Sequence, residues 1–462
     1  MTTVNVRWNA EMIRRYDLAG PRYTSYPTAP QFVDDYATSE VDAAVARSNA
    51  AGRPLSLYFH IPFCDTICYY CGCNKIVTAN KKRAQPYLDT LYQEIAMRAA
   101  QIDSDRPVHQ LHWGGGTPTY ISDEQKIQLM AETRKHFNLL DDDSGEYSIE
   151  IHPGAMNAET ISVLRELGFN RLSMGVQDFD PKVQEAVNRF NSFEEVAELV
   201  HKAKEEKFHS LSMDLIYGLP HQSVESVDRT LDQIIDLNPE RLSLFNYAHM
   251  PHLFKSQKQI DETTLPEPQE KLAILENSID QLQQAGYVYI GMDHFAKPND
   301  ALTIAQDNGE LQRNFQGYAT HGNCDLFAFG VSAISSIDNI FVQNHKDIPG
   351  YTKAIEEEKQ TPILKGLTLT DDDQLRQAVI NQLICHFELE YAPFNHAYQF
   401  DFCEYFADAL EELQPMIADG LIIRSDSGLK VSDDGRLLIR RICMAFDAYL
   451  KSPQPVRYSR II

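Results

Sequence analysis

One structural unit repeats through the first half of this chain at intervals of about 25 to 40 residues. In each unit a short β-branched or aromatic run is followed by a polar turn and then by an amphipathic stretch. The runs predict strands at residues 55–61, 110–113, 147–151, 171–176, 210–217 and 241–247. The amphipathic stretches predict helices at residues 84–100, 122–137, 157–167, 192–206, 223–236 and 269–285. This alternation indicates an α/β fold with a parallel sheet and right-handed crossovers.

Six strand–helix units are fewer than a closed eightfold barrel requires, so we expect a partial, open (β/α)6 barrel. Residues 289–295 and 325–335 are candidates for flanking strands whose pairing the sequence does not fix. Polar or glycine residues end several of the predicted strands, and the carboxyl ends of parallel strands form the functional face of barrel folds. These residues are His60, the glycines at 114–116, Glu150, His152, Gln177, Asp214 and Asn246.

The strand–helix alternation stops near residue 365, and helical patterns dominate from there. Residues 419–436 predict a hairpin with its turn at 425–428, followed by a helix from about residue 433. We therefore expect four segments. An N-terminal arm with a helical segment covers 1–50, the partial barrel 51–300, and a flanking segment and connection 301–364. A mainly helical domain with a small winged-helix-like hairpin covers 365–462.

The chain of 462 residues has a formal net charge of -24. We found no Lys/Arg-rich stretch that could form a basic patch, so the charge disfavours nucleic acid as a partner. An anionic substrate would require specific cations inside its pocket. The sequence has neither an N-terminal apolar region nor a run of about 18 apolar residues, which predicts a cytoplasmic protein with no membrane span.

Four of the eight cysteines lie within ten residues of one another, a spacing that fits one metal site in a reducing compartment. Cys64, Cys68 and Cys71 form C-x3-C-x2-C, and Cys73 follows two residues later. Thiolates are the usual ligands of a [4Fe–4S] cluster, and three of them leave one iron open for a substrate or cofactor. Two alternatives stay open at this point: a structural zinc site, and a ferredoxin-like carrier that uses Cys73 as its fourth ligand.

Residues 112–119, His-Trp-Gly-Gly-Gly-Thr-Pro-Thr, place three glycines directly after a predicted strand. Alone, this is either a loop that presents backbone N–H groups to a bound group or a tight turn. No Gly-Lys-Ser/Thr follows, which excludes a Walker loop. Together with the cysteine triad, the motif resembles the radical S-adenosylmethionine (SAM) superfamily. The resemblance implies that SAM chelates the open iron, that the glycine loop binds the SAM amino group, and that Cys73 stays off the metal.

Further motifs are similar to the family of oxygen-independent coproporphyrinogen III oxidases, and the likeness covers nearly the whole chain. They are residues 20–28, 58–64, 71–75, 170–178, 214–220 and 246–249. The resemblance implies a radical-SAM barrel with one [4Fe–4S] cluster and two SAM molecules. It implies an enzyme of haem biosynthesis that oxidatively decarboxylates two propionates of coproporphyrinogen III to vinyl groups. The product is protoporphyrinogen IX, and the oxidising species is a SAM-derived 5′-deoxyadenosyl radical formed without oxygen.

Carried over by motif, the resemblance assigns the site residues. Cys64, Cys68 and Cys71 would ligate the cluster, and Tyr58 and His60 are the catalytic candidates. The first SAM would contact Tyr58, Gly115 and Glu150, and the second would contact Tyr70, Gly116, Thr117, Gln177, Arg189, Asp214, Ala248 and Ile334. Some of these residues also have a purely structural interpretation. His60 could be a buried, hydrogen-bonded histidine, Asp214 a buried carboxylate with polar partners, and Arg189 a surface ion pair.

A substrate with four carboxylates meeting a chain this acidic needs local cations, and our candidate is Arg22, with Arg14, Arg15 and Lys75 behind it. The expected partners are coproporphyrinogen III and an electron donor of the flavodoxin or ferredoxin type, acting on a monomer. Two other functions compete: a haem chaperone of the same superfamily, and a radical-SAM methyltransferase that opens the porphyrin ring. Residues 20–28 and the pair Cys71 and Cys73 favour the oxidase.

Overall fold

The computed structural model describes residues 6–451 and 458–462. The chain divides into two compact units. The first, which we call the barrel unit, consists of Phe32–Ser278 and Asn323–Thr368. The second, which we call the terminal unit, consists of Met1–Gln31, Ile279–Gly322 and Leu369–Ile462. The four-segment division expected from the sequence stays a prediction.

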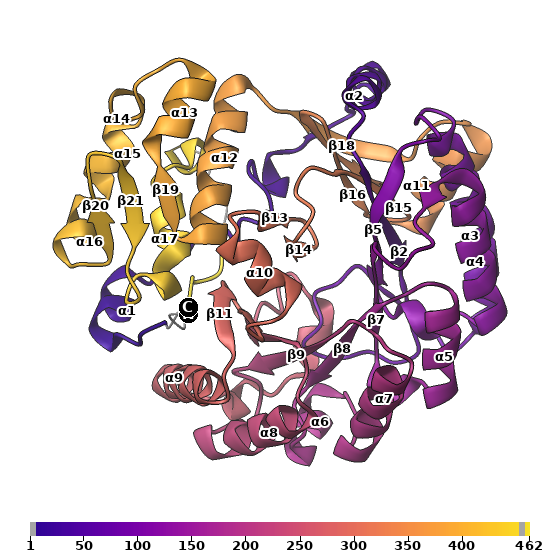
Figure 1. Cartoon of the computed structure of the whole chain (residues 1–462). Helices are drawn as coiled ribbons and strands as arrows, with labels where there is room; N and C mark the ends of the chain where they lie inside the picture. The colour runs from indigo at the N-terminus through magenta and orange to yellow at the C-terminus, as the bar shows by residue number, and fades with distance from the viewer. Residues whose placement is uncertain (1–5, 452–457) are drawn as a thin grey trace. The chain divides into compact units, whose positions relative to one another are not determined.

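Parallel strands form the centre of the barrel unit (Figure 1). Each of the six predicted strands is present, and each pairs in parallel with the next one along the chain. They are β2 (Leu55–Ile61), β5 (Pro107–Gly115), β7 (Glu146–Ile151), β8 (Arg171–Gln177), β9 (Ser210–Tyr217) and β10 (Arg241–Asn246). A short β6 (Asn138–Leu139) pairs with the start of β5. The predicted α/β architecture, a partial barrel of parallel strands, is therefore confirmed.

The segment near residue 325 supplies the flanking strands that the sequence left unplaced. Strand β15 (Asp325–Phe329) pairs in parallel with β2, with Asp325 opposite Leu55. Beyond β15 the sheet becomes antiparallel. Those strands are β16 (Ile334–Ile337), β17 (Ile340–Asn344), β18 (Ile363–Thr368) and β1 (Val33–Asp34). A sequence pattern cannot show that a strand 270 residues from β2 will pair with it, because pairing at that separation depends on the assembled sheet.

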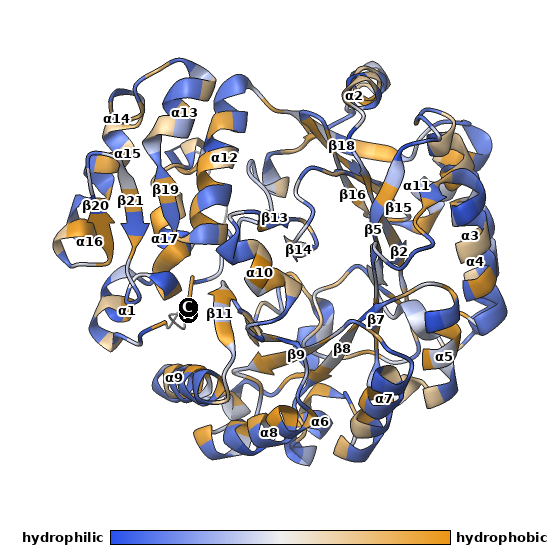
Figure 2. Cartoon of the chain, viewed as in Figure 1, coloured by the Kyte–Doolittle hydropathy of each residue, from blue (hydrophilic) through white to orange (hydrophobic). Residues whose placement is uncertain are grey.

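Helices lie against one side of the parallel strands (Figure 1). They are α3 (Ala84–Ala99), α4 (Asp123–His136), α5 (Ala158–Glu166), α6 (Pro181–Val187), α7 (Phe193–Glu205) and α8 (Val224–Leu237). Serines at 122, 192 and 223 begin α4, α7 and α8 in capping boxes, which pair backbone N–H groups of the first turn. Hydrophilic and hydrophobic residues alternate along α7 and α8, as expected for helices with one buried side (Figure 2).

Burial alternates along β7, β8 and β9, and this alternation positions the site. One residue in two is buried against the helices, and the intervening residues are only partly buried. Ser148 and Glu150 on β7, Ser173 on β8 and Asp214 on β9 belong to the partly buried set. Because side chains alternate across a strand, these residues share the face of the sheet opposite the helices.

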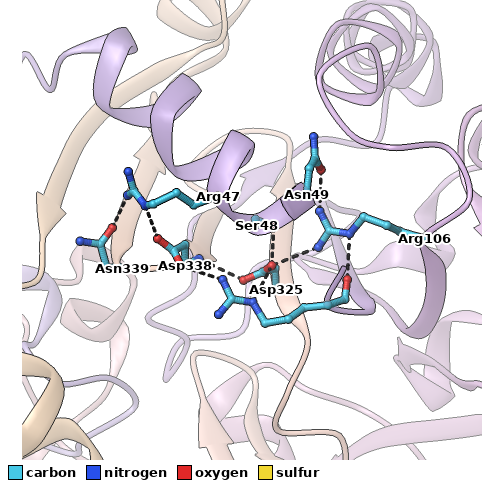
Figure 3. A network of polar contacts seen from close by, with 8 residues as sticks. Arg47, Ser48, Asn49, Arg106, Asp325, Asp338 and Asn339 are labelled. Atoms are coloured by element: carbon cyan, nitrogen blue, oxygen red, sulfur yellow. Dashed lines mark hydrogen bonds and ion pairs between the residues drawn. The ribbon is translucent and has the colours of Figure 1, made fainter. Parts of the chain in front are cut away.

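A polar network ties α2 (Thr38–Ala51) to the start of β15 (Figure 3). The carboxylate of Asp325 is 6% exposed and accepts hydrogen bonds from Ser48, from Arg53 Nε at 3.2 Å and from Arg106 Nη2 at 3.0 Å. Arg106, itself 3% exposed, also donates to the Arg53 carbonyl at 2.8 Å. Asp338 pairs with Arg53 at the edge of the network and is 21% exposed.

The terminal unit is mainly helical. Its helices are α1 (Ala10–Tyr16), α10 (Ala301–Asp307), α12 (Asp371–His386), α13 (Tyr391–Tyr398), α14 (Phe402–Tyr405), α15 (Ala407–Glu412), α16 (Gln414–Ala418) and α17 (Ile439–Met444). The predicted hairpin is present as β20 (Ile422–Arg424) and β21 (Gly428–Val431), joined by β19 (Glu388–Glu390) into a small sheet. The helix expected from residue 433 starts later, as a 3-10 turn at Arg436, because residues 432–435 form a turn closed by the Gly435 N–H and the Ser432 carbonyl.

The segment that follows β10 contains a long helix and a hairpin. Helix α9 (Pro268–Gln284), predicted at 269–285, crosses the boundary between the two units. The expected segment at 289–295 is a hairpin of β11 (Val288–Gly291) and β12 (His294–Ala296) in the terminal unit. No helix within residues 6–451 or 458–462 is both long and apolar enough to cross a membrane.

Candidate functional site

The cysteine loop begins where β2 ends. Cys64 is in the short strand β3 (Phe63–Cys64), which pairs in parallel with β4 (Ile76–Val77) and so closes the loop between them. All four cysteines of the loop are free thiols. Cys68 is buried, Cys64 and Cys71 are partly buried, and Cys73 is exposed. The predicted ligands and the additional cysteine therefore differ in exposure.

Hydrogen bonds to its backbone fix the shape of this loop. From α6 and the residue that follows it, the Val187 carbonyl accepts from the Tyr69 N–H at 2.9 Å, and Asn188 Nδ2 donates to the Ile67 carbonyl at 2.7 Å. Residues that follow β10 hold the other side: Gln257 Nε2 donates to the Tyr70 carbonyl at 3.0 Å, and Ser256 Oγ donates to the Cys71 carbonyl at 3.1 Å. The thiols are thus held at fixed backbone positions.

The surroundings of the three thiols suit thiolate ligands. Thr117 Oγ1 donates to Cys64 Sγ at 3.5 Å, and Arg189 Nη1 donates to Cys68 Sγ at 3.7 Å. Burial raises the pKa of Cys64 to about 11. The pKa of Cys71 is lowered by a hydrogen bond from the Cys73 thiol and by the charge of Lys75. Metal binding drives the deprotonation of a thiol that is otherwise neutral.

Within the described ranges, no three His, Cys, Asp or Glu side chains lie close enough together to share a single metal ion. A [4Fe–4S] cluster takes its thiolates on separate irons, so its ligands do not need to converge on one point. The triad, with a hydrogen-bond donor at two of its sulfurs, fits such a cluster.

The glycine loop packs directly against the cysteine segment. Gly115 has φ +119°, and a Cβ there would lie 2.8 Å from the His60 ring; a Cβ on Gly116 would lie 2.7 Å from the backbone of Pro62. The Gly116 N–H donates to the Ile61 carbonyl at 2.8 Å, and the Thr117 N–H donates to the Phe63 carbonyl at 2.8 Å. The backbone N–H groups at these two positions are therefore engaged within the protein, which favours the tight-turn interpretation there. The glycines instead allow the two segments to approach closely.

Both ring nitrogens of His60 have hydrogen-bond partners. Nδ1 accepts from the Tyr58 hydroxyl at 3.1 Å, and Nε2 lies 3.0 Å from the Asn74 carbonyl, to which only a protonated nitrogen can donate. Burial lowers the pKa of His60, so the ring is neutral with its proton on Nε2. This geometry favours the buried, hydrogen-bonded interpretation, in which His60 orients Tyr58 and the end of the cysteine loop.

Glu150 is at the centre of the predicted first SAM site. Its Oε2 accepts from the Gly115 N–H at 3.1 Å, and its Oε1 lies 3.4 Å from His112 Nε2. Burial raises the pKa of Glu150, but the hydrogen bond from His112 and the one from the Gly115 N–H outweigh it, and the net shift is downward. The carboxylate is 45% exposed, so one side of an anionic group is accessible to a ligand. An ionised carboxylate here can bind an ammonium or hydroxyl group.

Two residues of the predicted second SAM site have buried polar atoms without partners. In the part of the chain that the structure describes, Gln177 Oε1 and Arg189 Nε have no hydrogen-bond partner. Gln177 also has φ +70°, a strained conformation that is uncommon outside functional sites. Buried polar groups are nearly always hydrogen-bonded, so these atoms fit a site that a polar ligand completes.

Asp214 is beside these residues on β9 and accepts a hydrogen bond from Ser173 Oγ at 3.1 Å. Burial raises the pKa of Asp214 to about 6, and the nearby Glu150 carboxylate adds to the effect. The pKa is higher in the folded state than in the unfolded chain, so the folded protein loses stability as the pH rises through this interval.

We expect Asp214→Asn to raise the melting temperature at pH 8, because the wild-type carboxylate is then charged and its burial disfavours that charge. At pH 5 the folded wild type is largely protonated, and the difference should shrink. Calorimetry of the cluster-free proteins at the two pH values measures this. A stabilisation that grows as the pH falls would have the wrong sign for a raised pKa.

The remaining predicted site residues belong to both units of the chain. Tyr70, Ala248 and Ile334 belong to the barrel unit; Tyr70 is in the cysteine loop, Ala248 follows β10, and Ile334 begins β16. Arg22 belongs to the terminal unit, where it pairs with Asp293 at 3.0 Å.

Sequence reasoning missed the partners that orient Glu150 and Asp214. His112 on β5 stacks on the Tyr58 ring at 5.7 Å and bonds Ser148 Oγ at 2.5 Å. Ser243 on β10 hydrogen-bonds Asp214. A signal for the first pair was available: His112 and Ser148 are opposite each other on adjacent strands, two residues before Gly114 and Glu150.

Comparison with known proteins identifies both parts of the chain. The model of the radical SAM superfamily matches residues 58–234, and that of the HemN C-terminal domain matches residues 369–438. The oxygen-independent coproporphyrinogen III oxidase of Pseudomonas aeruginosa is 51% identical over 99% of both chains. The proteins of that name from Escherichia coli and a Synechocystis strain are 48% and 44% identical over the full length of both chains.

A solved structure gives the same result for the fold. The structure of coproporphyrinogen III oxidase (HemN) from Escherichia coli, described as a radical SAM enzyme, superposes with a TM-score of 0.92. The two sequences are 47% identical, and the match covers 96% of this chain and 100% of the other.

Proposed function

This chain belongs to the family of oxygen-independent coproporphyrinogen III oxidases, and from that membership we propose that it converts coproporphyrinogen III to protoporphyrinogen IX without oxygen. It is an oxidoreductase of the radical SAM superfamily, which implies a [4Fe–4S] cluster and SAM. The observation that carries the proposal is the grouping of three free thiols with hydrogen-bond donors, beside buried polar atoms that lack partners. An electron carrier of ferredoxin type needs no such ligand-sized set of polar groups.

Cys64, Cys68 and Cys71 would hold the cluster, with Cys73 left off the metal. When bound, the cluster and SAM supply a carbon-centred radical that removes hydrogen from a substrate propionate. The protein binds and orients the reactants. Glu150, held by His112 and the Gly115 N–H, is positioned to bind a SAM donor group, and Arg189 places a cation at Cys68 Sγ.

We propose that the site takes two SAM molecules. Tyr58, Gly115 and Glu150 would contact the first. The second would contact Tyr70, Gly116, Thr117, Gln177, Arg189, Asp214, Ala248 and Ile334. The unpartnered Gln177 Oε1 and Arg189 Nε support a second polar ligand, because the first site, which is built around Glu150, uses neither atom. Equilibrium dialysis with labelled SAM should give two molecules per chain, and Gln177→Ala should lower that number to one.

The substrate has four carboxylates, and Arg22 is our candidate to bind one of them. It pairs with Asp293 and is 37% exposed, so a substrate carboxylate has to compete with that aspartate for the guanidinium. We expect Arg22→Gln to raise the KM for coproporphyrinogen III about tenfold with little change in kcat, because a bidentate contact is lost before the chemistry begins. Asp293→Asn is the control; freeing Arg22 should lower the KM or leave it unchanged.

One assay tests the function. The reconstituted protein is incubated anaerobically with SAM, a chemical reductant and coproporphyrinogen III, and protoporphyrinogen and 5′-deoxyadenosine are measured together. The oxidase produces both. Haem binding without decarboxylation would indicate a chaperone, and a methylated, ring-opened product would indicate a methyltransferase. Both outcomes would contradict the proposal.

A further inference from the structure

Positive charge is concentrated near the cysteine loop in a chain whose net charge is -24. Residues 66–88 contain no aspartate or glutamate, but they contain Lys75, Lys81, Lys82 and Arg83. Residues 241–260 also lack carboxylates, and they contain Arg241, Lys255 and Lys258. Both stretches therefore have a local excess of basic residues in a chain whose acidic residues outnumber basic ones by 66 to 42.

The fold brings the two stretches together around the cysteines. A Cβ on Gly72 would lie 3.0 Å from the Phe254 ring. The hydrogen bonds from Ser256 and Gln257 to the loop backbone fix Lys255 and Lys258 beside it. A third segment joins them, because Asn74 Nδ2 donates to the Lys346 carbonyl at 2.9 Å.

We call the exposed cations of these three segments the cationic rim: Lys82, Arg83, Lys255, Lys258 and Lys346. Within the described residues, none of them forms an ion pair. The neighbouring carboxylates are engaged elsewhere: Asp65 pairs with Lys81 at 2.8 Å, Glu262 with His249 at 3.0 Å, and Asp347 caps the start of α11 (Ile348–Thr352). The five cations of the rim are thus not paired directly with these carboxylates.

Two apolar side chains are exposed in the same segments. Val77 is 40% exposed and Leu253 is 62% exposed. Transient interfaces of redox proteins are small and combine apolar with charged side chains.

Resting on the function proposed above, we propose that the cationic rim docks an acidic one-electron carrier protein that reduces the cluster. Exposed loop residues Gly72, Cys73 and Asn74 would be covered by the carrier, which shortens the path to the thiols. One electron leaves the reduced carrier and one enters the cluster, so the carrier is oxidised by one electron and no atom is transferred. Complementary charge speeds such an encounter without requiring a tight complex.

The composition of the rim favours a protein over the small substrate. Four of its five cations are lysines, which act as mobile point charges, whereas buried recognition of a carboxylate favours the bidentate arginine fork. The five also come from three separate segments on the surface. This arrangement suits long-range attraction of a large acidic partner.

The test compares two double variants of equal charge change. Lys82→Glu/Lys258→Glu alters the rim. Lys182→Glu/Lys207→Glu alters two lysines that are also exposed but belong to α6 and to the turn after α7. Anaerobic titration of the cluster-loaded proteins with a purified acidic flavodoxin at low salt should show about tenfold weaker binding for the rim variant and no change for the control. High salt should remove most of the difference, because exposed charges are screened.

Turnover separates this inference from the function itself. With dithionite as reductant, the rim variant should match the wild type in kcat and in KM for coproporphyrinogen III; with reduced flavodoxin it should be slower. Unchanged flavodoxin affinity in the rim variant overturns the inference, as does an equal loss in both double variants. A raised KM with dithionite would assign the rim to the substrate, and preferential binding of a short RNA would assign it to nucleic acid; both overturn it. A wild type that is inactive with dithionite refutes the function, and the binding result still decides the docking.

Discussion

We expect Cys68→Ala to eliminate product formation and to leave little iron in the anaerobically purified protein. Cys68 is the buried member of the triad, and its sulfur is 3.7 Å from the Arg189 guanidinium. Two thiolates cannot retain a cubane that needs three. The alanine also removes the sulfur to which the Arg189 guanidinium donates a hydrogen bond. Iron and sulfide analysis, together with the anaerobic product assay, measures both losses.

Cys73→Ser is the matched control. Cys73 lies in the same loop, two residues from Cys71, but its side chain is exposed. If the triad holds the cluster, this variant should retain about four irons per chain. The opposite pattern, with iron lost on replacing Cys73 and kept on replacing Cys68, would mean that the ligand assignment is wrong. It would also reopen the four-thiolate carrier that the spacing alone leaves possible.

We expect Asp325→Asn to destabilise the barrel unit by about 3–5 kcal/mol, the usual cost of removing one partner of a buried ion pair. Arg106 is 3% exposed and keeps its charge when the aspartate is neutralised. The same carboxylate holds Ser48 and Arg53, so α2 and the start of β15 lose a common anchor (Figure 3). We expect the urea midpoint of the barrel unit to fall clearly.

The chain has two tryptophans, one in each unit, so the unfolding of the barrel unit can be followed by itself. Trp113 is fully buried on β5 and contacts Phe59, so its fluorescence in a Trp8→Phe background reports the barrel unit. Asp338→Asn is the control. Asp338 is 21% exposed, and its partners Arg47 and Arg53 are 49% and 34% exposed, so the loss of these partly solvated ion pairs should cost less than the loss of the buried Asp325–Arg106 pair, about 1 kcal/mol for each pair. Equal destabilisation by the two variants would mean that burial does not set the cost.

The fold was predictable where local pattern determines structure. The six strands and their helices follow from the alternation of apolar runs with amphipathic stretches, since each strand pairs with its neighbour in sequence. Strand β15 is different, because it pairs with β2 only after the chain has passed through all the other parallel strands. Helix α6 was missed because its seven residues, Pro181–Val187, give too few turns for a periodic signal.

The candidate site also has parts that the sequence predicts and parts that it does not. Cys64 stands out by the spacing of the cysteine triad, Glu150 and Asp214 stand out because they were assigned to the ends of predicted strands, and motif resemblance supplies their roles. The hydrogen bonds of Gly116 and Thr117 to the cysteine segment could not be predicted, because they join β5 to the residues after β2 only in the folded chain. The cationic rim was missed for a similar reason, since a search for basic stretches finds no cluster that is assembled from three segments.

The central claim is that three thiolates hold the cluster and leave one iron for SAM. Mössbauer spectroscopy of the intact protein, purified without oxygen and enriched in the absorbing isotope of iron, tests it most directly. We expect one iron of the cluster to change its isomer shift and quadrupole splitting when SAM is added, while the others keep theirs. A spectrum in which every iron has sulfur ligation and none responds to SAM would contradict the account.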